Sequence, residues 1–212
     1  MLILGPRKKY LTMKMNKSTI WAFVILLVTA SLYRSWDSRP FGFAPQMAMA
    51  LFGGAVIRDK RFAVLLPLLS LLISDTLYEI LYTNGLSSIQ GFYEGQLFTY
   101  ILFVGITFFG MLMKKINFKN VLGFTVSGSL IFFLLSNFGV WFAGAGLQRP
   151  KTFDGLMLCY GDALAFYRDY GLINGFYGNQ LLGDLFFSGL LFGAFVLVRN
   201  YFFKPVIVKS EA

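Results

Sequence analysis

Six apolar segments dominate this sequence, and each of them approaches the length of a membrane crossing. They cover residues 19–33, 41–57, 61–83, 96–113, 120–145 and 178–203. A transmembrane helix needs about 20 predominantly apolar residues, and we expect all six segments to cross, some of them as tilted or bent helices. The segment 41–57 is the weakest of them because it contains Pro45 and Gln46. The pattern predicts an all-α membrane protein with six transmembrane helices.

The composition excludes a water-soluble enzyme. Of the 212 residues, 57% are hydrophobic and 14% are charged, whereas soluble domains carry about 25% charged residues. The chain has no His and one Cys. Zinc sites, haem ligation, nucleophiles that depend on a histidine and an intrachain disulfide are therefore excluded. We expect no catalytic residues, no metal and no cofactor.

The basic residues predict the orientation in the membrane. With both termini in the cytoplasm, 14 of the 19 Lys and Arg residues fall on the cytoplasmic side and five on the outer side. Cytoplasmic loops of membrane proteins carry such an excess. Residues 1–18 and 206–212 are then cytoplasmic tails around one domain, residues 19–205. The net charge of +9 suits anionic lipid headgroups, at about 1 kcal/mol per basic residue, and we expect no nucleic-acid partner.

The longest segment between predicted spans, residues 146–177, lies on the outer side and is rich in aromatic and acidic residues. Its apolar pattern predicts one or two short amphipathic helices on the outer membrane face. The loop 84–95 adds Phe92 and Tyr93. Two interpretations stay open for these aromatic side chains. They form the interfacial belt of a membrane protein, or they fold into a lid over an outward-facing cavity.

Polar side chains at membrane depth gather in one layer near the outer surface. Ionisable groups there cost about 2.5–3.5 kcal/mol, which marks each of them as a candidate functional residue. The candidate substrate-binding residues are Gln46, Asp75, Glu79, Asn137, Asn179 and Asp184. An ion or proton conduit needs polar groups at several depths, so the single layer favours a pocket open to the outside. The alternative is that Asp75, Asn137 and Asp184 hydrogen-bond one another or Arg39 and hold the helices together.

Pairs of small residues four positions apart predict close contacts between helices. The three pairs are Ala44 with Ala48, Ala50 with Gly54, and Gly189 with Gly193.

A family resemblance rests on residues of the second and third apolar segments. It is carried by Phe43-Ala44-Pro45-Gln46, the small-residue run from Ala48 to Ala55, Leu66-Pro67-Leu68 and Leu72-Ile73-Ser74-Asp75. Over about residues 39–200 the chain resembles a group of uncharacterised bacterial six-helix inner-membrane proteins. That group is similar in layout to the substrate-binding S components of energy-coupling factor transporters. The resemblance implies a multi-pass inner-membrane protein whose outward pocket is roofed by loops, with a coupling subunit and ATPases as partners.

Two functions follow from these observations. The first is a solute-binding or uptake component, whose acidic and aromatic pocket takes a small cationic or ring-containing solute. No G-x-x-x-x-G-K-[ST] motif is present, so ATP-derived energy would come from partner subunits. The second is an accessory or anchoring subunit of a larger membrane complex. An intramembrane aspartyl protease built on Asp75 and Asp184 is disfavoured, because the flanking Tyr-Asp and Gly-x-Gly-Asp patterns are missing.

Overall fold

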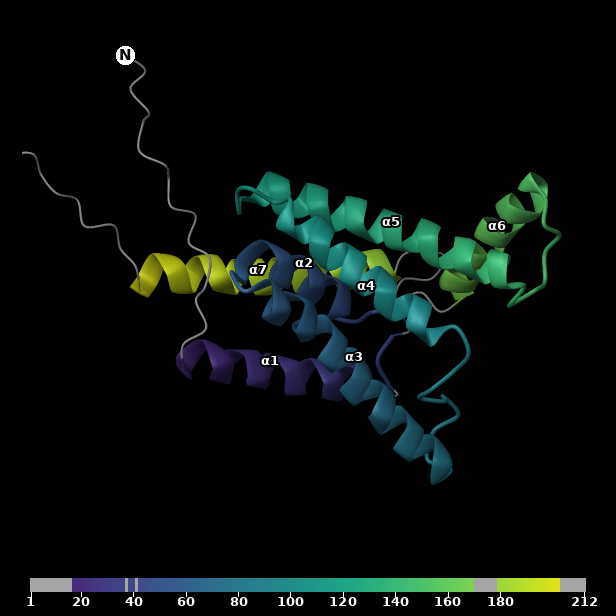
Figure 1. Cartoon of the computed structure of the whole chain (residues 1–212), viewed down its shortest axis with the longest axis horizontal. Helices are drawn as coiled ribbons and strands as arrows, with labels where there is room; N and C mark the ends of the chain where they lie inside the picture. The colour runs from purple at the N-terminus through teal and green to yellow at the C-terminus, as the bar shows by residue number, and fades with distance from the viewer. Residues whose placement is uncertain (1–16, 37, 41, 170–178, 203–212) are drawn as a thin grey trace, which may run out of the picture.

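Every predicted apolar segment coincides with a helix. A computed structural model describes residues 17–36, 38–40, 42–169 and 179–202. Within these ranges the chain forms seven helices and no strand (Figure 1), which confirms the all-α class. The helices are α1 (Lys17–Arg34), α2 (Gln46–Val56), α3 (Lys60–Thr83), α4 (Gln96–Met111), α5 (Phe118–Ala143), α6 (Phe153–Asp169) and α7 (Asn179–Phe202). Most of both predicted tails lies outside the described residues.

The helix lengths correct the predicted number of spans. Three described helices are long and apolar enough to cross a membrane, namely α3, α5 and Asn179–Asn200 of α7. The other three predicted spans, in α1, α2 and α4, are shorter apolar helices. The α2 helix has 11 residues because Pro45 is its N-cap and Ile57, in extended conformation, ends it. Three of the six predicted spans therefore have spanning length in the described structure, and the other three do not.

Side-chain caps and a glycine fix the bounds of α3 and α5. The Asp59 side chain accepts a hydrogen bond from the Arg61 backbone N–H at the start of α3. The Asn117 side chain does the same for Asn120 at the start of α5, at 2.9 Å. Gly144 follows α5 in left-handed conformation (φ 75°), which glycine adopts at little cost.

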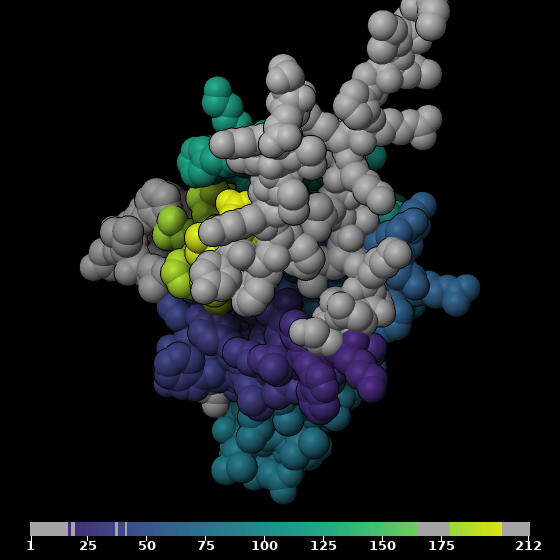
Figure 2. Space-filling view, turned by 90° about the vertical axis from the view of Figure 1, so that its left-hand side faces the viewer, coloured from purple at the N-terminus to yellow at the C-terminus, as the bar shows by residue number. Residues whose placement is uncertain are grey.

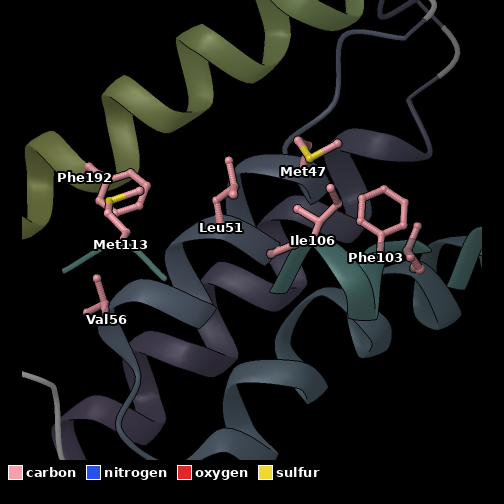
Figure 3. Close-up of a cluster of buried hydrophobic side chains, with 9 residues drawn as sticks. Met47, Leu51, Val56, Phe103, Ile106, Met113 and Phe192 are labelled. Carbon is pink, nitrogen blue, oxygen red and sulfur yellow. The ribbon is translucent and has the colours of Figure 1, made fainter. Parts of the chain in front are cut away.

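The α2 helix lies at the centre of the fold. Figure 3 shows Met47 and Leu51 of α2 among Phe103 and Ile106 of α4 and Phe192 of α7, the main members of the largest buried apolar cluster. Burial of each such side chain stabilises a soluble fold by about 1.5–3 kcal/mol; inside a bilayer, close packing has to supply the stability instead. The core is therefore built around α2, although α2 is the shortest of the seven helices.

Small residues bring α2 and α4 into backbone contact. A Cβ added at Gly54 would lie 2.1 Å from the Thr107 carbonyl oxygen, and one added at Gly110 would lie 2.6 Å from that of Leu51. The close contact predicted at Gly54 is confirmed. Gly189 and Gly193 have no neighbouring atom within 4 Å of such a Cβ. The contact predicted for that pair is therefore not made within the described chain.

The two ends of the bundle carry different elements. The first turn of α1 and the last turn of α7 lie at the same end, at the left of Figure 1, while α6 and the loop after α3 lie at the other. Figure 2 views the first of these ends, where the purple α1 lies next to the yellow α7. Tyr33 and Phe187 join these two helices, with ring centroids 5.4 Å apart.

Candidate functional site

A cavity of about 380 Å³ is lined by residues of six helices, α1 to α5 and α7, and lies away from the end where α1 begins. Residues outside the helices complete its wall. They are Arg39, Gly42 and Ala44 ahead of α2, and Ile89, Gln90 and Tyr93 of the loop 84–95. The polar lining residues are Arg34, Arg39, Gln46, Asp75, Tyr78, Gln90, Tyr93, Thr99, Gln180 and Asp184. The apolar ones include Met47 and Phe103, at the right of Figure 3. The cavity therefore borders the core cluster at Met47, Leu71 and Phe103.

Three of the six predicted site residues line this cavity. Gln46, Asp75 and Asp184 come from α2, α3 and α7, and each is at least 98% buried. The three residues line the same cavity because they lie at a similar level along the bundle. The other three predicted residues, Glu79, Asn137 and Asn179, are not among the lining residues.

Asp75 is held by neighbours on three sides. Its Oδ1 pairs with the Arg34 guanidinium. Its Oδ2 accepts hydrogen bonds from Gln96 Nε2 at 2.5 Å and from the Tyr100 hydroxyl at 2.6 Å. Both carboxylate oxygens thus have partners within the protein, which is what a buried charge needs. Asp75 is therefore a structural centre that joins α1, α3 and α4.

Arg34 lines the cavity but was not among the predicted site residues. The sequence placed it only among the basic residues of the outer side. Arg34 ends α1 and also donates to Ser74 Oγ at 2.5 Å. One turn earlier, Ser31 donates to the Ser70 carbonyl at 3.1 Å, and this buried pair sets the register of α1 against α3. Because both helices run in the same direction, the basic end of α1 comes level with Asp75. The sequence could have indicated the pair, because Arg34 and Asp75 lie at a similar level on two predicted spans that run in the same direction.

Arg39 carries a positive charge into the cavity wall without an acidic partner. It donates to the carbonyl oxygens of Arg34 and Pro40, and to the Tyr78 hydroxyl at 3.3 Å, all of them neutral acceptors. Within the described ranges no carboxylate lies within ion-pair distance of it. Asp75 therefore forms its ion pair with Arg34, and the predicted pairing with Arg39 is not made.

Two other lining residues carry oxygen atoms without partners. Gln46 donates from Nε2 to Ser70 Oγ at 3.1 Å, but its Oε1 accepts no hydrogen bond. Asp184 Oδ2 likewise has none. Buried polar atoms almost always have a partner in the protein or in bound water. Among the buried side-chain atoms of the described residues that line the cavity, these two oxygens are therefore free to bind something else.

The loop 84–95 covers the cavity, and Glu79 holds this loop. Ile89, Gln90 and Tyr93 are lining residues. Glu79 Oε2 accepts from the backbone N–H groups of Gly91 and Phe92, at 3.0 and 3.1 Å. Glu79 thus anchors the cover instead of contacting the cavity.

Removing the Glu79 carboxylate is expected to loosen this loop. Hydrogen bonds to a charged group contribute about 1.5–3 kcal/mol, so Glu79→Ala should speed amide hydrogen exchange in residues 84–95 by tenfold or more. Exchange followed by mass spectrometry on the purified protein measures this. Glu94→Ala is the matched control, because Glu94 is an exposed acid of the same loop. Equal exchange in both variants would contradict the anchoring role.

The segment predicted to share the cover packs elsewhere. Helix α6 lies along α5, where Tyr160 donates to the Leu134 carbonyl at 3.1 Å and the Cys159 thiol lies 3.6 Å from that of Asn137. Burial raises the pKa of the Cys159 thiol, which keeps it protonated and unreactive. No described residue of α6 lines the cavity. The lid interpretation thus has support for the loop 84–95 alone, and residues 170–178 lie outside the described ranges.

The last two predicted site residues, Asn137 and Asn179, interact within the protein and do not line the cavity. Asn137 donates to the Phe133 carbonyl of its own helix at 2.8 Å. Asn179 is buried at the start of α7 and has an interaction partner. Gln180, which follows it, reaches the cavity instead.

Comparison with known proteins gives a family and no function. Residues 14–207 match the model of a family of unknown function, DUF6580. No curated protein matches the chain, and no solved structure matches it.

Proposed function

The chain belongs to the DUF6580 family of unknown function, and we propose that it is an integral membrane component that binds a small solute for uptake. Three helices of spanning length support a location in the membrane. The observation that carries the proposal is the cavity of about 380 Å³, with two unpartnered acceptor oxygens in its wall. Pockets for small molecules have volumes of about 300–1,000 Å³.

We propose six membrane crossings with both termini in the cytoplasm. The shorter helices α1, α2 and α4 would cross as part of a bundle whose other members reach further. The common position of the start of α1 and the end of α7 supports this arrangement (Figure 1). So do the basic residues at the same end, Arg58, Lys60, Arg61, Lys114, Lys115 and Lys119. The cavity would then open to the outer side.

Interhelical bonding alone does not account for the cavity wall. Side chains that only hold helices together satisfy one another, as Asp75 does with Arg34, Gln96 and Tyr100. Gln46 Oε1 is buried and accepts nothing, and Arg39 has no acidic partner in the described structure. An unsatisfied buried group costs about 1–3 kcal/mol. A bound solute that donates to Gln46 would remove that cost.

The lining indicates the kind of solute. Tyr78, Tyr93, Phe103 and Phe132 present aromatic rings to the cavity, and rings pack well against rings. We therefore propose a ring-containing solute with at least one hydrogen-bond donor, directed at Gln46. Energy would come from partner subunits, as in the S components that the sequence resembles.

Mass spectrometry of the protein purified gently from its native membrane tests this proposal. We expect an adduct of small-molecule mass on the 23.9 kDa chain. Gln46→Leu removes the unpartnered acceptor and should weaken the adduct about tenfold or more. Ala44→Trp, which fills part of the cavity, should abolish it. Thr107→Val is the matched control, because Thr107 is equally buried but donates to Phe103 within α4. A bare chain from wild-type membranes would contradict the proposal.

An accessory or anchoring subunit is the alternative. It is favoured by the open surface at Gly189 and Gly193 of α7, where no atom of this chain lies within 4 Å of an added Cβ. Small residues at such a surface let another helix approach closely. Stoichiometric purification with a large complex and without a small molecule would select this alternative.

A further inference from the structure

Three unpartnered polar atoms gather at the contact of α5 with α7. In the described structure, four buried side-chain atoms have no hydrogen-bond partner, and apart from Gln46 Oε1 they are Thr125 Oγ1, Asp184 Oδ2 and Ser188 Oγ. All three belong to these two helices. Their concentration at one contact, below the cavity, indicates a common cause.

The helix register places these atoms together. The two helices run in opposite directions (Figure 1), and Ser129 of α5 hydrogen-bonds to Asp184 of α7. Thr125 precedes Ser129 by one turn, and Ser188 follows Asp184 by one turn. In an antiparallel pair both steps lead in the same direction along the bundle. The register therefore places Thr125 and Ser188 at one level, one turn beyond the first pair and on the same helix faces. All four side chains are at least 95% buried.

The hydroxyls of this cluster are not satisfied by their own helix. Elsewhere in the chain, buried hydroxyls donate to the carbonyl four residues earlier, as Ser31, Ser74 and Thr107 do at 2.8–2.9 Å. This is the usual solution for Ser and Thr in an apolar helix. Thr125 and Ser188 make no such bond. Their oxygen atoms are therefore available as ligands.

The cluster is open on one side and closed on the other. Asp184 lines the cavity, which gives access from the outer side. One turn further inward lie Val121 and Phe192, both part of the apolar core around Leu51. Phe52 packs against Phe192 with ring centroids 5.3 Å apart. An ion could enter from the cavity and would stop at this apolar layer.

We propose that Thr125, Ser129, Asp184 and Ser188 bind a monovalent alkali cation at the floor of the cavity. One carboxylate and three hydroxyls form an all-oxygen set of ligands, which suits hard cations. Asp184 has no basic partner among the described residues. A single positive charge would neutralise it inside the membrane, where an uncompensated charge is expensive, whereas a divalent ion would leave an excess. The site is separate from Gln46, the acceptor proposed for the solute.

Cation-dependent stability tests this site. The purified protein is unfolded by heat in sodium chloride, in potassium chloride and in choline chloride at equal ionic strength. A bound ion stabilises the folded state in proportion to the logarithm of its concentration above Kd. We expect a saturable rise of Tm with sodium or potassium and none with choline. Asp184→Asn should abolish the rise, and Thr125→Val should weaken the apparent affinity at least tenfold.

Matched variants separate the site from general effects. Thr107→Val makes the same change at a buried threonine of α4 and should retain the full response. Ser188→Ala, a milder change, should also weaken the affinity, and it serves if Asp184→Asn does not fold. Gln46→Leu should keep the cation response while weakening the solute adduct, so the two proposals fail separately. Equal stabilisation by choline, or an unchanged response in Ser188→Ala and Thr125→Val, would overturn the cation site.

Discussion

Replacing Asp75 by alanine is expected to destabilise the protein by about 3–5 kcal/mol. The substitution leaves Arg34 partly buried without its acidic partner. It also removes the carboxylate that accepts from the Tyr100 hydroxyl and from Gln96, which keeps the Gly91 carbonyl as an acceptor. Breaking a buried ion pair from one side costs more than the pair contributes, because the remaining charge stays buried. Reversible unfolding in mixed micelles measures the loss. Asp154→Ala, at an exposed acid of α6, should change stability by less than about 0.5 kcal/mol.

A double variant distinguishes the contribution of the Arg34–Asp75 pair to stability from the cost of leaving Arg34 unpaired. Arg34→Met combined with Asp75→Leu replaces both charged groups by apolar ones of similar size. We expect this variant to recover a large part of the stability lost in Asp75→Ala, because apolar replacements of buried pairs are often neutral or stabilising. A double variant that is as unstable as the two single losses added together would show that Arg34 and Asp75 act independently.

The second large effect is expected at Gly54, where α2 touches the backbone of α4. A glycine inside a helix is normally improved by alanine, by about 0.5–1 kcal/mol. At Gly54 the added Cβ would lie 2.1 Å from the Thr107 carbonyl oxygen and 2.9 Å from the Met111 nitrogen. Backbone atoms of a packed helix cannot rotate away, so the two helices must separate. Gly54→Ala should therefore destabilise the protein by about 3 kcal/mol.

Gly105 provides the matched control on the facing helix. It lies inside α4, it is exposed, and a Cβ there meets nothing within 4 Å. Gly105→Ala should stabilise the protein by about 0.5–1 kcal/mol. The two variants make the same chemical change in neighbouring helices with opposite expected signs. Unfolding curves that shift in the same direction would contradict the backbone contact between α2 and α4.

The positions of the helices could be predicted from the sequence because their apolar segments are long. The extent of α2 could not be predicted. The apolar segment has 17 residues (41–57), but the helix starts only after Pro45, which is its N-cap. Within the polar layer, depth along each helix correctly brought Gln46, Asp75 and Asp184 together. Depth is readable because every residue advances the helix by 1.5 Å.

The rotation of each helix about its axis was not readable, and this explains the residues that do not line the cavity. Asn137 lies at the predicted level, but α5 turns it toward its own backbone and α6. Glu79 lies one turn past Asp75, where the chain has already folded back over α3. Such rotations are set by packing against neighbours, which the sequence of one helix does not specify.

The predicted polar layer was built from carboxylate and amide side chains and included no hydroxyl group. The polar layer consequently ended at Asp184 in the prediction, whereas Thr125 and Ser188 continue the buried polar groups by one further turn. Their role depends on whether each hydroxyl bonds to its own helix, which only the coordinates show. The buried polar groups at the contact of α5 with α7 therefore extend further along these two helices than the predicted layer.

The short central helix has a consequence for how the chain is made. At 11 residues α2 is about 16 Å long, half the thickness of a bilayer core. On leaving the ribosome it has too few apolar residues to be retained in lipid alone, and its ends would leave peptide groups without partners. The packing surfaces that hold α2 form only when α3 and α4 are in position around it. Biogenesis should therefore be ordered, with the flanking helices inserted first and α2 drawn in afterwards.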